Sequence, residues 1–139
     1  MPLPERVSAL ADRILPSSAG IGVSLMRAVM GLLFLKEGWS KLNDFAGTCE
    51  YFGQLGIPFP ELNAYLVGYT EFLGGLLLLL GLFTRLAAVP IALTMVVAIL
   101  TAHREGGWSY PLLILATCIG LLQSGAGPFS LDKRLSRKR

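Results

Sequence analysis

Glu71 is the side chain whose type and position in this sequence point most directly to chemistry. It is the one charged residue in residues 62–83, a stretch otherwise dominated by apolar side chains. A carboxylate surrounded by lipid has no hydration, so it must face protein or water and needs a partner or a proton. Acids in this position usually mark a proton, ion or ligand site, and we predict that Glu71 exchanges protons. A buried ion pair that only sets helix register is the alternative.

Four further side chains are candidate site residues. Glu37 precedes Lys41 by four residues, which is the favourable order for an ion pair on one helix. His103 follows the third apolar stretch and is a second candidate for proton exchange, with a plain histidine at the rim as the alternative. The candidate ligand-binding residues are Arg27, Glu37 and Lys41. For Arg27, pairing with backbone carbonyls or lipid phosphate is favoured over a ligand.

The elements that must position these side chains are four membrane-spanning helices. We predict them at residues 21–42, 62–83, 86–102 and 108–122, with Pro90 in the first turns of the third. Adjacent helices with short connections pack as antiparallel neighbours. The outer half of this bundle should therefore hold one cavity, and its predicted charged lining is Glu37, Lys41, Glu71 and His103.

The loop at residues 43–61 is predicted to cover that cavity. Residues 45–55 can form a short amphipathic helix, which the two prolines of Gly56-Ile57-Pro58-Phe59-Pro60 then interrupt. Side chains expected to press this lid onto the bundle are Phe52, Leu55, Ile57 and Phe59.

Small residues predict that a neighbouring helix backbone comes close to the second span. A helical wheel places on one stripe of the first span Arg27, Gly31, Phe34, Gly38 and Lys41. The face of the second span that carries Glu71 also shows Gly68, Gly74 and Gly75. Glycines at such positions let two helix backbones approach closely in a membrane.

Composition indicates an integral membrane protein. The chain has 139 residues, of which 53% are hydrophobic and 15% charged, whereas soluble domains carry about a quarter charged residues. The net charge of +3 comes largely from a C-terminal run of Lys133, Arg134, Arg137, Lys138 and Arg139. This run is typical of a cytoplasmic anchor beside anionic lipid, and it lacks the interleaved aromatic residues of a nucleic-acid site.

The distribution of bases predicts the organisation of the chain. Residues 1–20 read as a cytoplasmic leader or interfacial helix, 21–125 as the four-helix domain and 126–139 as a basic cytoplasmic tail. Because residues 43–61 contain no Lys or Arg, the positive-inside rule places both termini in the cytoplasm. The fold class is thus an all-α, multi-pass four-helix membrane bundle.

The two cysteines give little support to thiol or metal chemistry. Cys49 and Cys118 do not form a CxxC pair, which argues against a dithiol relay. An idle thiol is favoured for Cys49 over a metal ligand or an intermolecular disulfide, and Cys118 reads as a packing residue. We predict no metal site and no intrinsic cofactor, since no haem, flavin or iron–sulfur motif is present.

Several segments in order resemble the DoxX family of small membrane proteins. They are Arg27, Gly31-Leu32-Leu33-Phe34, Gly38-Trp39-Ser40-Lys41-Leu42, Glu71-Phe72-Leu73-Gly74-Gly75, Gly81-Leu82-Phe83-Thr84-Arg85, His103 and Gly127-Pro128-Phe129-Ser130-Leu131-Asp132. The resemblance implies a four-helix protein of the bacterial cytoplasmic membrane. Family members include the DoxD subunit of thiosulfate:quinone oxidoreductase and a mycobacterial protein associated with oxidative-stress defence.

Two functional hypotheses follow from the residues and the resemblance. The first is a quinone-linked redox subunit, in which Glu71 and His103 exchange protons and a partner protein holds the redox centre. The second is a non-catalytic membrane scaffold or binder of a small hydrophobic ligand, in which the buried charges are structural. A homo-oligomer is compatible with both hypotheses, and enzymatic activity is left open.

Overall fold

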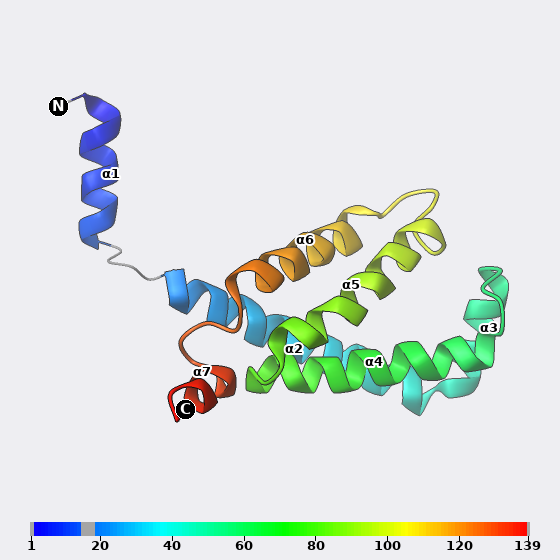
Figure 1. Cartoon of the computed structure of the whole chain (residues 1–139). Coiled ribbons are helices and arrows are strands. Elements are labelled where there is room, and N and C mark those ends of the chain that lie inside the picture. Colours follow the sequence, from blue (N-terminus) through cyan, green and yellow to red (C-terminus); the bar gives the residue numbers. More distant parts are fainter. Residues whose placement is uncertain (1, 15–18, 139) are drawn as a thin grey trace.

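The computed structural model describes residues 2–14 and 19–138, and within those residues the chain is helical without any strand. Figure 1 shows the described helices: α1 (Leu3–Ile14), α2 (Ala19–Asn43), α3 (Phe45–Gln54), α4 (Pro60–Leu80), α5 (Thr84–Leu100), α6 (Ser109–Ser124) and α7 (Leu131–Ser136). The predicted all-α class and the short helix in the loop at residues 43–61 are confirmed. The short helix α7 was not anticipated.

Helices α2 and α4 form an antiparallel pair whose backbones touch. A Cβ atom on Gly31 would lie 2.8 Å from the Gly75 carbonyl oxygen, and one on Gly38 would lie 2.7 Å from the Gly68 carbonyl oxygen. Real Cβ atoms are not found so close to backbone oxygen, so only glycine fits at these crossings. The close approach predicted from the small residues is confirmed, and it sets the register that positions Lys41 and Glu71.

Gly38→Ala is expected to destabilise the fold by about 1–3 kcal/mol, because the added methyl group must push α2 away from α4. Gly120→Ala is the matched control: Gly120 lies within α6, and a Cβ there would meet no atom within 4 Å. That control should be neutral or slightly stabilising, since alanine favours helix over glycine. Thermal unfolding of the purified variants in one detergent measures both effects, and equal melting temperatures would contradict the backbone contact.

Helices α5 and α6 form a second hairpin, which packs on the first at one end and diverges from it at the other (Figure 1). The end with the 81–83 turn and α7 is called the α7 end below, and the opposite end is called the α3 end. The buried core joins both hairpins through Phe34, Leu78, Ile91, Ile114, Cys118 and Leu121. Cys118 is fully buried there, as its predicted packing role requires.

Helix α5 begins at Thr84, two residues before the predicted start. Pro90 therefore lies in the second turn, past the N–H groups that have no helical partner, so its missing donor costs α5 a hydrogen bond that the predicted start would have made less costly. The early start has a local cause, because the Asp132 carboxylate accepts hydrogen bonds from the backbone N–H groups of Phe83 and Thr84. A carboxylate at a helix N-terminus satisfies donors that have no partner within the helix.

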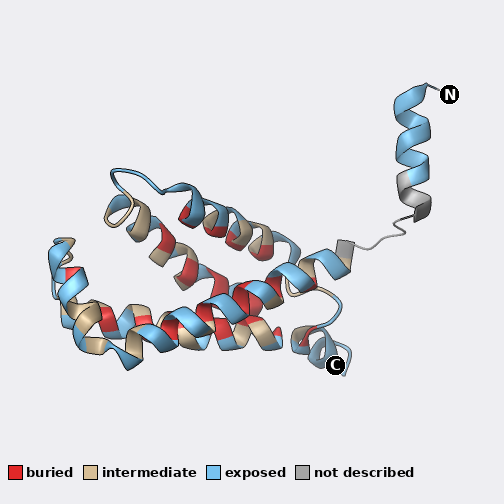
Figure 2. Ribbon diagram, turned by 180° about the vertical axis from the view of Figure 1, so that it is seen from behind, coloured by how far each residue is buried: buried red, intermediate tan, exposed pale blue. Residues whose placement is uncertain are grey.

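The outward surfaces of the main helices are apolar. Figure 2 shows that buried residues line the contacts between helices while the outer faces are exposed. Exposed side chains on those faces include Leu25, Val29 and Leu32 of α2, Leu73, Leu76 and Leu80 of α4, Val89, Val96 and Leu100 of α5, and Leu113 and Ile119 of α6. Among the described helices, α4 is long and apolar enough to cross a membrane by length and composition, and α5 and α6 are shorter apolar helices.

Helix α1 extends away from the two hairpins (Figure 1). Its Leu3, Val7 and Leu10 lie at helical spacing and are all exposed. Of the two interpretations of residues 1–20, a leader or an interfacial helix, the structure thus has a helix at Leu3–Ile14. Part of the predicted leader, residues 15–18, lies outside the described residues.

Candidate functional site

A cavity of about 760 Å³ lies at the α3 end, where the two hairpins diverge. Helices α2, α3, α4, α5 and α6 all contribute to its wall. Its charged and titratable lining contains Glu37, Lys41, Glu71 and His103. The placement of these four side chains around one cavity, predicted from the helix order, is confirmed. The volume falls within the range of about 300–1,000 Å³ that is usual for small-molecule sites.

An ion pair between Lys41 and Glu71 lies in the wall of this cavity. The Lys41 Nζ is 2.6 Å from Glu71 Oε2 and 3.6 Å from Glu37 Oε2. The exposed fraction is 5% for the Glu71 side chain, 24% for Lys41 and 51% for Glu37. The Glu71 carboxylate is therefore buried, and its charge is balanced by the Lys41 ammonium group. That ammonium group also contacts Glu37, which lies in the more open part of the cavity.

The direction of the helices explains why this pair can form. Side chains on an α-helix lean toward its N-terminus. Because α2 and α4 are antiparallel, Lys41 leans inward from the α3 end while Glu71 leans outward toward it. The lysine stem then spans the difference in height between the two Cα atoms. A carboxylate that needs a partner receives one from the neighbouring helix, as the sequence predicted.

The rest of the lining is mostly apolar. Phe52, Leu55 and Ile57 line the cavity from the lid segment, as predicted. Phe59 does not, since its side chain is 76% exposed, and this part of the prediction is wrong. Phe59 stands between two prolines, and the chain reverses into α4 there with a left-handed backbone (φ 50°) that directs the side chain outward.

Uncharged polar side chains in the lining were missed by sequence reasoning. They are Tyr51, Asn63, Thr70, Thr94, Thr101 and Tyr110. Thr94 and Thr101 donate to the carbonyls of Ile91 and Val97 in their own helix, and Asn63 donates to the Pro58 carbonyl. The sequence signal that could have found Thr70 is its position next to Glu71 in an apolar helix.

His103 lies in the wall formed by the second hairpin, in the turn between α5 and α6. It is half-buried, and within residues 2–14 and 19–138 its ring makes no hydrogen bond to the Lys41–Glu71 pair. The structure thus brings His103 to the same cavity as Glu71 but on the opposite hairpin. Proton exchange with a ligand by Glu71 and by His103 remains a prediction.

Arg27 is not part of this cavity. Its guanidinium group is buried toward the α7 end and donates to four backbone carbonyls: Leu78, Leu79 (3.0 Å), Ala126 (2.9 Å) and Phe129 (2.7 Å). The preference for backbone carbonyls stated for Arg27 is confirmed. Its grouping with Glu37 and Lys41 as ligand-binding residues is not supported by this geometry, because carbonyls already occupy its donors. Arg27 is separated from the cavity because it lies toward the α7 end of α2, whereas Glu37 and Lys41 lie toward the α3 end of the same helix.

A structural lock at the α7 end was also missed by sequence reasoning. Besides its bonds to the start of α5, Asp132 donates its backbone N–H to the Gly81 carbonyl, and the Ser130 hydroxyl accepts from the Lys133 N–H as the cap of α7. Together with Arg27, these contacts join α2, the α4–α5 turn and the segment after α6. The Ser130-Leu131-Asp132 sequence, a polar pair after a Gly-Pro stop, was the available signal.

The described cysteines and acids do not form a metal site. Within the described ranges no three His, Cys, Asp or Glu side chains gather closely enough to hold an ion. Cys49 is a free thiol, and desolvation together with the Glu61 carboxylate raises its pKa above the ordinary value for cysteine. A raised pKa keeps the thiol protonated, which makes Cys49 a weak nucleophile.

The site is chemically suited to an amphipathic molecule. A wide apolar cavity ends in one cation and two carboxylates, with a histidine on the facing wall. Lys41 can donate a hydrogen bond to a ligand oxygen while its charge remains balanced by Glu71 and Glu37. Such a cavity would accept an apolar body with one or two polar oxygen atoms, and it offers groups that hold a proton beside those atoms.

Comparisons with known proteins identify a family for this chain. The DoxX family model matches residues 22–104. A Bacillus subtilis protein named "Putative oxidoreductase CatD" is 35% identical, covering 81% of this chain and 85% of its own length. A Mycobacterium tuberculosis protein named as an uncharacterized membrane protein is 39% identical, covering 91% and 88%. The Escherichia coli inner membrane protein YqjF is 35% identical, covering 85% and 95%. No solved structure matches this chain.

Proposed function

This chain belongs to the DoxX family of membrane proteins, and we propose that it binds the head group of a lipid-soluble quinone in the cavity at its α3 end. The observation that carries the proposal is the buried Lys41–Glu71 pair in the wall of a largely apolar cavity of about 760 Å³. A quinone head group has a flat apolar ring and two carbonyl oxygens, which this combination of groups can accommodate.

The membrane arrangement forms part of the proposal. The apolar outer faces of α2, α4, α5 and α6 support four crossings of the bacterial cytoplasmic membrane, with the basic α7 end in the cytoplasm. Helices of 16 and 17 residues reach about 24–26 Å, so α5 and α6 would cross where the bilayer is thin or with their flanking turns included. The cavity would then open on the side away from the cytoplasm.

Each residue of the site would have a separate task. Lys41 would donate a hydrogen bond to a carbonyl oxygen of the head group, and Glu71 would hold Lys41 in place and hold a proton at its own carboxyl oxygen. His103, on the facing wall, would hold a second proton. A bound quinone supplies two-electron chemistry, and a redox partner protein would supply the electrons. The oxidoreductase name of the Bacillus subtilis relative supports this class of role.

Glu71→Gln is expected to weaken binding of a benzoquinone with a decyl tail by about tenfold, since it removes the charge that holds the Lys41 ammonium in the cavity. Titration of the purified full chain in detergent measures the dissociation constant. Glu61→Gln is the matched control, because Glu61 lies on the same helix, is exposed and does not line the cavity. Unchanged affinity in Glu71→Gln would remove the proposed role of the pair.

A further inference from the structure

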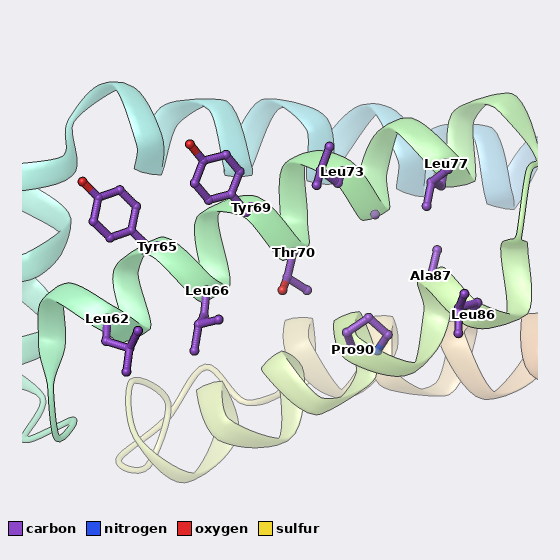
Figure 3. Close-up of a pocket in the computed structure, with 11 residues that line it drawn as sticks. Leu62, Tyr65, Leu66, Tyr69, Thr70, Leu73, Leu77, Leu86, Ala87 and Pro90 are labelled. Carbon is purple, nitrogen blue, oxygen red and sulfur yellow. The ribbon is translucent and has the colours of Figure 1, made fainter.

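A second hollow lies between α4 and α5, on the outer surface of the molecule (Figure 3). It is a groove of about 380 Å³ with an almost entirely apolar lining. Leu62, Leu73 and Leu86 on its rim are 58%, 52% and 69% exposed, so the groove opens toward the surface that faces lipid in the proposed arrangement.

The groove and the cavity share three residues. Leu66, Thr70 and Pro90 line both hollows, which makes the gap between α4 and α5 a common wall. Figure 3 shows Leu66 and Thr70 extending from α4 toward the helix that carries Pro90. Glu71 follows Thr70 directly in the sequence. It lines the cavity but not the groove. The apolar groove therefore ends beside the polar part of the cavity.

Two features leave hydrogen-bonding groups at this common wall without a protein partner among the described residues. Pro90 has no N–H to donate to the carbonyl of Leu86 one turn earlier, so one helical hydrogen bond is missing from α5 at the groove. The hydroxyl of Thr70 forms no hydrogen bond in the described part of the chain, whereas those of Thr94, Thr101 and Thr117 each donate to their own helix. A free hydroxyl at the boundary between an apolar groove and a polar cavity is available to a ligand.

We propose that the groove between α4 and α5 binds the apolar tail of the ligand whose head group occupies the cavity, and that the ligand enters sideways from the bilayer past Leu66, Thr70 and Pro90. This inference rests on the proposed function and narrows it to a ligand class: a polar head group with a long isoprenoid or alkyl tail. The two hollows are continuous through the residues they share, and the apolar one lies on the lipid side of the proposed arrangement.

A pair of probes tests this inference: 2,3-dimethoxy-5-methyl-1,4-benzoquinone without a tail, and the same ring with a decyl tail. Leu73→Trp fills the groove, and Leu73 does not line the cavity. The expected result is a loss of roughly tenfold in affinity for the decyl compound and unchanged affinity for the tailless ring. Use of one detergent throughout cancels the partitioning of the tail into micelles.

Leu76→Trp is the matched control, since Leu76 lies on the same helix, is also exposed and lines neither hollow. It should bind both compounds like the wild type, and a matching melting temperature shows that both variants fold. Equal affinity of Leu73→Trp and Leu76→Trp for the decyl compound would overturn the inference while the head-group site stands. Failure of the wild type to bind either compound would instead remove the proposed function, and this inference with it.

Discussion

Replacement of Arg27 by methionine is expected to lower the free energy of unfolding by about 4 kcal/mol, the largest single effect that the structure predicts. Arg27 is 3% exposed, and its guanidinium group is the donor for the carbonyls of Leu78, Leu79, Ala126 and Phe129. Methionine matches much of the length of arginine but donates nothing. Two of the four acceptors belong to the last turn of α4, where the N–H groups four residues ahead, those of Leu82 and Phe83, bond the Leu77 carbonyl and the Asp132 carboxylate instead.

Thermal or denaturant unfolding in detergent measures this loss, with Arg85→Met as the control. Arg85 also lies near the α7 end and donates to a backbone carbonyl, that of Gln123 at 3.3 Å, but its side chain is exposed. Its replacement should change stability by less than about 0.5 kcal/mol. Arg27→Lys should lie in between, because a single ammonium group cannot reach carbonyls on both α4 and the segment after α6. An Arg27→Met protein as stable as Arg85→Met would show that the hydrogen bonds of Arg27 to the four carbonyls do not stabilise the fold.

The helices and the composition of the cavity could be predicted from the sequence because each depends on a local or topological rule. Apolar stretches bounded by prolines, glycines and charges predicted the main helices and the short lid helix. Antiparallel packing then placed Lys41, Glu71 and His103 at one end, where the structure has them. The glycines beside Glu71 predicted the close approach of a neighbouring backbone, because a missing side chain permits an approach that no other residue allows, and the structure identifies α2 as the helix at Gly68 and Gly75.

The divergence of the two hairpins was not predictable from the sequence. The angle between helices depends on how particular side chains interlock, such as Ile91 against Gly74, where a Cβ would come within 2.9 Å of Ile91 Cδ1. Helical periodicity contains no information on that fit. The fit of these side chains also shapes the groove and the common wall at Thr70, and backbone conformation turns Phe59 outward. None of these features could be seen without the three-dimensional structure.

The lock at the α7 end escaped prediction for a different reason. Each of its hydrogen bonds has a backbone group on at least one side, and its side chains come from sites far apart in the sequence, such as Arg27 and Asp132. A single sequence does not show which carbonyls a buried arginine will meet. The glycines at positive φ near these contacts, Gly81 and Gly127, hint at crowded turns, but they do not identify the partner.

Lys41→Met is expected to destabilise the protein by about 3 kcal/mol, because the Glu71 carboxylate would stay buried without its partner. Glu71→Leu should cost less, since the Lys41 side chain is 24% exposed and its ammonium group can turn toward water. The double variant Lys41→Met/Glu71→Leu should recover most of the loss, because two apolar side chains of similar size need no compensation. Unfolding measurements on the three proteins give the coupling energy, with Lys36→Met on the exposed side of α2 as the control.

The double variant also separates the two hypotheses for the site. If the pair only sets helix register, an apolar replacement that restores stability should leave ligand binding unchanged. If Lys41 and Glu71 hold the head group, the same protein should fold and yet lose affinity for the decyl benzoquinone by about tenfold or more. Affinity and stability would then respond to the double replacement in opposite ways, which a purely structural ion pair does not allow. A stable double variant with wild-type affinity would leave the cavity as a site for hydrophobic ligands without a polar anchor.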